Sequence, residues 1–119
     1  MNSKKVTLVN KTNQKTIANN VIICTSPFQQ MRGLMFRKKP IPLLFPFKKE
    51  KYCSIHMGFV FFPIDLLFLD EHKRIVEMKQ KIRPFRCYTT KRKIKYMIEL
   101  PANTITSSAC KIGSSISFK

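Results

Sequence analysis

Two arginines and an aspartate are the residues of this chain whose types and spacing could bind an anion or anchor a sheet. Arg32 and Arg37 flank a short apolar segment, and Asp65 interrupts an otherwise apolar strand. A carboxylate buried in such a strand must gain a partner or shift its pKa. Asp65 therefore either forms a bidentate ion pair with one of the two arginines, or orients both in a ligand pocket that also contains Met35 and Met57. The first alternative is structural, and the second predicts a site for an anionic ligand.

Basic clusters interleaved with aromatic residues are the second feature that could do chemistry. The formal net charge is +17, from 23 Lys and Arg against 6 Asp and Glu. A surface this basic attracts polyanions, nucleic acid first and an anionic lipid surface second, whereas the solvated lysines of a lysine-rich proteome are the alternative. Grooves that bind single strands combine cations for the phosphates with rings for the bases. The candidate residues are Arg83, Phe85, Arg86, Tyr88, Lys91, Arg92, Lys93 and Lys95.

The other reactive side chains form no recognisable catalytic or metal-binding pattern. His56 is a candidate general base, but no Ser or Cys nucleophile stands at the spacing of a dyad, and Cys53 is expected on the opposite face of a strand. Glu99 is interpreted as a solvated or salt-bridged strand residue. The four cysteines lie far apart and are interpreted as free thiols, so we expect no metal site and no cofactor.

Length and composition predict a single domain that covers residues 1–119. The chain is 44% hydrophobic and contains ten Phe, which is enough apolar material for one core without disulfides or metal. No internal repeat or linker divides it. Short strands that alternate with turn signals predict a mainly β fold, a compact antiparallel β sandwich or barrel with one or two short helices.

One short helix is predicted to begin after Ser26. Ser26 suits the N-cap, Pro27 suits the first helical position, and Gln29 can close a capping box. Gly33 can supply the left-handed residue at its end. A second short helix or a turn is expected within residues 104–110.

The remaining elements are predicted as strands. A hairpin is expected from residues 6–9 and 20–24, on either side of a polar stretch. Three prolines within residues 40–46 favour an edge strand or an extended loop over a central strand. Further strands are expected at residues 52–57, 64–69, 74–81, 94–100 and 115–118.

No segment of the sequence is typical of a membrane span or a signal peptide. The longest apolar run, residues 55–69, is too short to cross a bilayer and is interrupted by His, Pro and Asp. The first residues pass into a strand without the apolar region of a signal peptide. We therefore expect a cytoplasmic protein with no membrane partner, whereas the oligomeric state is not indicated.

Four motifs occur in the order in which a known family has them. They read TSPFQQMRGLMFR at 25–37, HMGFVFFPIDLLFLD at 56–70, RPFRCY at 83–88 and IELPANT at 98–104. Together they resemble the prokaryotic domain of unknown function 192, and the second motif is similar to the family's archaeal branch. Asn103 stands where the family usually has Gly, a change that the left-handed conformation tolerates. The resemblance implies a compact, mostly β, cytoplasmic domain and no established reaction.

Three function classes remain open from the sequence. The first is a non-enzymatic domain that binds a polyanion, RNA or DNA, without strong sequence preference. The second is a small-molecule-binding or enzymatic domain with its pocket near Arg32, Arg37 and Asp65, and the third is an accessory protein whose charge is incidental. A single basic stripe on the surface favours the first class, and an even spread of charge removes its main support.

Overall fold

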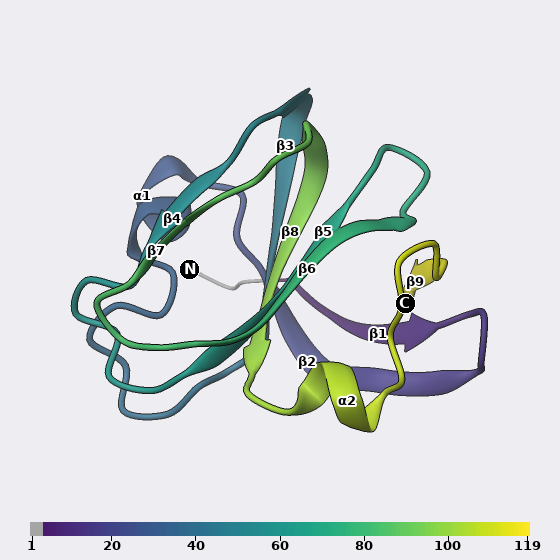
Figure 1. Ribbon diagram of the computed structural model, residues 1–119, viewed down its shortest axis with the longest axis horizontal. Helices are drawn as coiled ribbons and strands as arrows, with labels where there is room; N and C mark the ends of the chain where they lie inside the picture. The colour runs from purple at the N-terminus through teal and green to yellow at the C-terminus, as the bar shows by residue number, and fades with distance from the viewer. Residues whose placement is uncertain (1–3) are drawn as a thin grey trace.

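A computed structural model describes residues 4–119, apart from the side chains of Pro27, Phe28 and Met31. Most of this part forms one curled seven-stranded sheet (Figure 1) in the order β6-β5-β8-β3-β2-β1-β9. Neighbouring strands are antiparallel except β2 and β3, which are parallel. The mainly β prediction is therefore confirmed. The strands are β1 (Lys5–Asn10), β2 (Lys15–Ile23), β3 (Leu43–Lys51), β5 (Ile64–Leu69), β6 (Ile75–Ile82), β8 (Ile94–Pro101) and β9 (Ile116–Phe118).

A small second sheet and two short helices complete the described part of the chain. Strand β4 (Ser54–His56) pairs antiparallel with β7 (Cys87–Thr89). The helices are α1 (Pro27–Arg32) and α2 (Thr104–Ser107). Figure 1 shows α1, β4 and β7 together at one end of the molecule, and α2 below the sheet beside β2.

The sheet carries a core cluster on each face. All six residues of β5 are buried, with Leu67 and Leu69 in one cluster and Leu66 and Phe68 in the other. Successive side chains of a strand point to opposite faces, so the two clusters lie on opposite sides of the sheet. Glu99 on β8 is the register partner of Leu66 and faces the second cluster.

The predicted helix start is confirmed. The Ser26 hydroxyl accepts a hydrogen bond from the Gln29 backbone N–H at 3.1 Å, and the Gln29 side chain accepts one from the Ser26 backbone N–H at 3.2 Å. Gly33 ends the helix at a φ of +49°, where its N–H donates to the Gln29 carbonyl. This turn directs the chain that follows α1 toward β4.

The hairpin prediction is confirmed by β1 and β2, but two other strand predictions are wrong. Strand β3 lies inside the sheet, between β8 and β2, although its prolines favoured an edge. Pro46 is accommodated because the β3–β8 ladder becomes irregular between Pro46 and Lys51. Residues 52–57 do not form a core strand; they contain only β4, with both of its end residues exposed.

Within residues 4–119, no helix combines the length and apolar character that crossing a bilayer requires.

Candidate functional site

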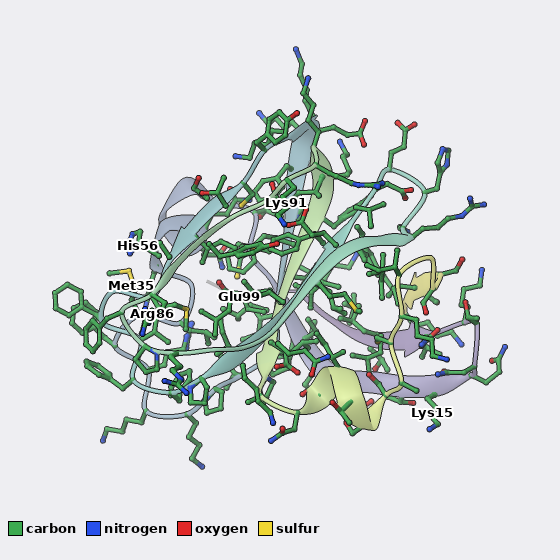
Figure 2. The ribbon with its side chains drawn as sticks, viewed as in Figure 1. Lys15, Met35, His56, Arg86, Lys91 and Glu99 are labelled. Atoms are coloured by element: carbon green, nitrogen blue, oxygen red, sulfur yellow. The ribbon has the colours of Figure 1, made fainter. Side chains whose placement is uncertain are left out.

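A cavity of about 320 Å³ lies between α1, the loop after it, β4 and the inner strands β3 and β8. Its wall is about equally polar and apolar. Figure 2 shows Met35 and His56 near the α1 end of the molecule and Glu99 deeper inside. The lining residues are Gln30, Arg32, Gly33, Leu34, Met35, Phe45, Phe47, Lys51, Cys53, Ser54, Ile55, His56, Met57, Val60, Ile64, Met97 and Glu99.

Glu99 is the polar group at the inner wall of this cavity. Its side chain is buried, with 6% of the residue exposed, and its Oε1 has no hydrogen-bond partner among the described residues. Burial raises the pKa of this carboxyl from 4.5 to about 7, against an opposing effect of the Arg37 charge. At neutral pH this group can therefore accept a hydrogen bond as a carboxylate or donate one as an acid.

The turn that ends α1 is built against this carboxyl. A Cβ placed on Gly33 would lie 3.2 Å from Glu99 Oε1 and 3.6 Å from the ring of Phe45. Arg37 curls back over the same turn, because its Nε donates to the Gly33 carbonyl at 3.2 Å. Glycine at position 33 thus supplies both the positive φ and the space that brings the backbone next to Glu99.

Two exposed cations lie on the cavity wall, Arg32 at the end of α1 and Lys51 at the end of β3. The Lys51 ammonium sits 4.3 Å from the centroid of the Phe47 ring, which also lines the cavity. Across the described residues, the one side-chain ion pair joins Glu71 to His72, so neither cation is neutralised by a carboxylate.

Sulfur atoms form much of the apolar wall. Met35, Met57 and Met97 line it together with Cys53, whose Sγ lies 3.9 Å from the Met97 Sδ. Burial raises the pKa of the Cys53 thiol, which keeps it protonated and weakens it as a nucleophile. Cys53, which was expected on the opposite face of a strand from His56, lies just before β4 and is buried, whereas His56 is exposed. Both residues line the cavity. The prediction of four free thiols is confirmed.

The predicted pocket is brought together only in part. Arg32, Met35 and Met57 line the cavity, and Arg37 lies behind the turn beside Glu99. Asp65 does not line it.

Asp65 is fully buried, but its predicted arginine partner is wrong. Its two carboxylate oxygens accept hydrogen bonds from the backbone N–H groups of Lys81 and Ile105, each at 2.9 Å. It therefore joins β5, β6 and the start of α2, on the sheet face opposite Glu99. A sequence does not reveal whether a buried carboxylate will meet side-chain or backbone donors.

Glu99 is the site residue that sequence reasoning missed, since it was interpreted as solvated or salt-bridged. The available signal was its position within the apolar run of residues 96–100, in a strand too apolar to have a solvent face.

The predicted polyanion residues fall into two groups at opposite ends of β7. Arg83, Arg86 and Tyr88 line a groove of about 360 Å³ together with Lys79 and Lys81. Phe85, beside it, is 66% exposed. The second group, which follows β7, consists of Lys91, Arg92, Lys93 and Lys95.

Several residues of this set have structural partners. The Tyr88 ring stacks on Phe68 with its centroid 5.8 Å away, and the Tyr88 hydroxyl donates to Glu77. The backbone N–H groups of Lys91 and Arg92 donate to the same carboxylate. One face of the Tyr88 ring is therefore unavailable to a stacked base.

Four exposed phenylalanines form an aromatic cluster, and one of them, Phe85, belongs to the predicted polyanion residues. Phe36, Phe59, Phe61 and Phe85 are each between 51% and 66% exposed. Phe36 stacks on Phe59 at 4.7 Å, and Phe61 packs edge-on against Phe85 at 6.3 Å. Three of the four have positive φ, a costly conformation for a phenylalanine. We call these four residues the aromatic cluster.

Positive charge is spread widely over the molecule. Figure 2 shows Lys15, Arg86 and Lys91 on separate parts of it, and basic residues occur in or beside most strands. This distribution does not form a single stripe.

Comparisons with known proteins find relatives and a shared fold. The family model DUF192, described as "Uncharacterized ACR", matches residues 8–118. A "UPF0127 protein" of Thermococcus sibiricus is 34% identical over 115 residues, which cover 94% of this chain and 74% of that protein.

Two solved structures have the same fold at a TM-score of 0.83. A "putative transcription regulator" of Sinorhizobium meliloti 1021 is 20% identical, with 99% of this chain and 96% of the other covered. A protein of unknown function from Novosphingobium aromaticivorans is 15% identical, with 97% and 84% covered. At these identities the likeness establishes the fold alone.

Proposed function

The chain belongs to the DUF192 family, for which no reaction is established, and we propose that it is a small-molecule-binding protein whose ligand occupies the cavity around Glu99. The observation that carries the proposal is Glu99, a buried carboxyl that lines the cavity and whose Oε1 has no hydrogen-bond partner among the described residues. A buried polar atom left unpaired costs about 1 to 3 kcal/mol. A ligand with a hydrogen-bond donor would remove this cost.

The character of the cavity supports the same function. Ligand sites are mostly apolar hollows of about 300 Å³ or more, with a small number of polar groups that fix orientation. This cavity combines apolar side chains with one interior carboxyl and two cations on its lining. A perturbed carboxyl pKa inside a hollow is a further feature of functional sites.

Methionine methyl groups give a direct test, because the cavity lining contains three of the chain's six methionines. Protein labelled at the methionine methyls is titrated with a chemically diverse library of small molecules and followed by NMR. Compounds that bind should shift Met35, Met57 and Met97, while Met78, which packs against the other core cluster, serves as the control. If no compound shifts the three cavity methyls, or if all methyls shift together, the proposed function is wrong.

Polyanion binding is the second candidate, and the groove beside the aromatic cluster favours it. The groove gathers Lys79, Lys81, Arg83 and Arg86 next to the exposed ring of Phe85. Four phosphate contacts would give a slope of about −3 in a plot of log affinity against log salt for a single strand. Because the remaining positive charge is widely spread, we expect nucleic acid to contact no more of the surface than this groove.

Fluorescence anisotropy with labelled single-stranded RNA at several salt concentrations measures this slope. Replacing Arg83 and Arg86 with Gln should reduce it to about −1.5, since two contacts are lost. The matched control replaces Arg92 and Lys93, which lie beyond β7 and change the net charge equally. Equal effects of the two double variants would show that binding is diffuse, and this candidate would then be abandoned.

A further inference from the structure

The polar groups of the cavity are arranged with a negative group inside and positive groups around it. Glu99 is buried at the inner wall, whereas Arg32 and Lys51 are exposed residues on the lining. Stacking on Phe47 holds the Lys51 ammonium at the cavity rather than in bulk solvent. A ligand that matches this arrangement carries a cationic donor at its inner end and an anionic group toward the rim.

The two charges of such a ligand can be close together. Gly33, whose added Cβ would lie 3.2 Å from Glu99 Oε1, is the residue directly after Arg32. The backbone of Arg32 is therefore near the carboxyl, and both residues line the cavity. A ligand that carries an ammonium and a carboxylate on one carbon offers one charge to each of them.

The rest of the wall suits an apolar side chain. Met35, Met57 and Met97 line it with unbranched, polarisable thioethers that adapt to the shape of an apolar group. No second buried acid lines the cavity among the described residues, so a ligand with two cationic groups would leave one of them unmatched.

We infer that the ligand is a free α-amino acid with an apolar side chain, its ammonium on Glu99, its carboxylate on Arg32 and its side chain against the three methionines. The inference rests on the proposed function of the cavity and names the chemical class of its ligand. Such a ligand would contact three features of the site: the interior carboxyl, the exposed guanidinium and the methionine side chains.

Proton linkage gives this inference a signature that a purely structural Glu99 would lack. Of the neighbouring charges, that of Arg37 acts on the Glu99 pKa, and Arg32, Lys51 and His56 line the same cavity. Burial raises the pKa of the Cys24 thiol to about 11 and raises that of Cys53, so neither thiol releases a proton near pH 6. Because His56 is a second titratable group on the lining, the exchanged proton is assigned to Glu99 by comparison with Glu99→Gln. An ammonium favours the ionised carboxylate, so binding releases a proton, whereas an anionic ligand would take one up.

The experiment compares four compounds that share an isobutyl group: L-leucine, isoamylamine, 4-methylpentanoate and isoamyl alcohol. Isothermal titration at pH 6 in buffers of different ionisation enthalpy measures affinity and proton exchange together. We expect leucine to bind at least tenfold more tightly than each analogue, with proton release. Glu99→Gln should lower the affinity for leucine at least tenfold and abolish the proton release.

Arg32→Gln separates the two charges of the ligand. It should lower the affinity for leucine at least tenfold but leave that for isoamylamine unchanged. The matched control Arg92→Gln, which is not part of the cavity lining, should change neither affinity. Tighter binding of 4-methylpentanoate or of the alcohol than of leucine would overturn the inference. The inference would also be overturned if leucine and its analogues did not shift the methyl signals of the cavity methionines while other library compounds did. In each of these cases the proposed function stands, because it is tested separately by the methyl shifts of the compound library.

Discussion

Replacing Glu99 with Gln should stabilise the protein above neutral pH, although most substitutions of buried residues destabilise. The carboxyl pKa is 4.5 in an unfolded chain and about 7 in the native protein, because burial disfavours the charged form. At 1.36 kcal/mol for each pKa unit, this difference corresponds to about 3 kcal/mol. Such a value is a large fraction of the free energy of unfolding of a small domain, which is typically about 5 to 15 kcal/mol.

The sign of the effect follows from proton binding. Below pH 4.5 the carboxyl is protonated in both states and costs nothing. As the pH rises toward 7, the unfolded chain releases its proton while the native protein retains it, so the free energy of unfolding falls. Above pH 7 the native protein contains an ionised buried carboxylate, and the full cost of about 3 kcal/mol persists.

Urea unfolding from pH 4.5 to pH 8 measures this difference between wild type and Glu99→Gln. The two proteins should be similar in stability at pH 4.5, and the variant should be about 3 kcal/mol more stable at pH 8. Taking the difference cancels the other titrating groups, and Glu50→Gln, on the exposed end of β3, controls for the loss of one negative charge. Parallel pH profiles for wild type and Glu99→Gln would refute the assignment of a strained, unpaired carboxyl.

Three further predictions concern residues around the core and the cavity. Asp65→Ala should lower the free energy of unfolding by about 3 to 5 kcal/mol in urea titrations, because two backbone N–H groups, one of them that of Ile105, lose their acceptor. A loss below 1 kcal/mol would contradict this role. Gly33→Ala should lower the free energy of unfolding by about 1 to 2 kcal/mol, because alanine is strained at the positive φ of this position. It should also lower the affinity for ligands that contact Glu99, and an unchanged affinity would show that the turn has no role in binding. At pH 8, dithionitrobenzoate should react quickly with one thiol of the four, the exposed Cys87, and Cys87→Ser should remove that fast phase.

Much of the fold follows from local signals in the sequence. The capping box at Ser26, the hairpin of β1 and β2, and the apolar run of β5 depend on neighbouring residues, and each is confirmed. Strand β3 was predicted at an edge because proline has no backbone N–H to donate within a sheet. The prolines do not reveal that the ladder around Pro46 is irregular enough to accept one inside a sheet.

The site was less predictable because it is assembled from distant segments. Arg32 and Met57 were expected to share a pocket, and they do, but its central group proved to be Glu99 on another strand. The aromatic cluster has the same origin, since Phe36 meets Phe59 through a backbone hydrogen bond between two loops. Single-sequence patterns describe periodicity within an element and contain little information on which loops meet.

The two buried carboxyls of the sheet differ in how the cost of their burial is balanced. Asp65 and Glu99 lie on adjacent strands, where Leu66 pairs with Glu99 and Asp65 pairs with Leu100, so they face opposite sides of the sheet. Asp65 receives two backbone donors, which balance the cost of its burial.

Glu99 has no such compensation at Oε1, although glutamine or an apolar residue at this position would avoid the cost. The chain also places Gly33 and its positive φ against this oxygen, which keeps the space beside it open. A carboxyl that weakens the fold, faces a cavity and is given room by a glycine is better explained by what it binds than by what it stabilises.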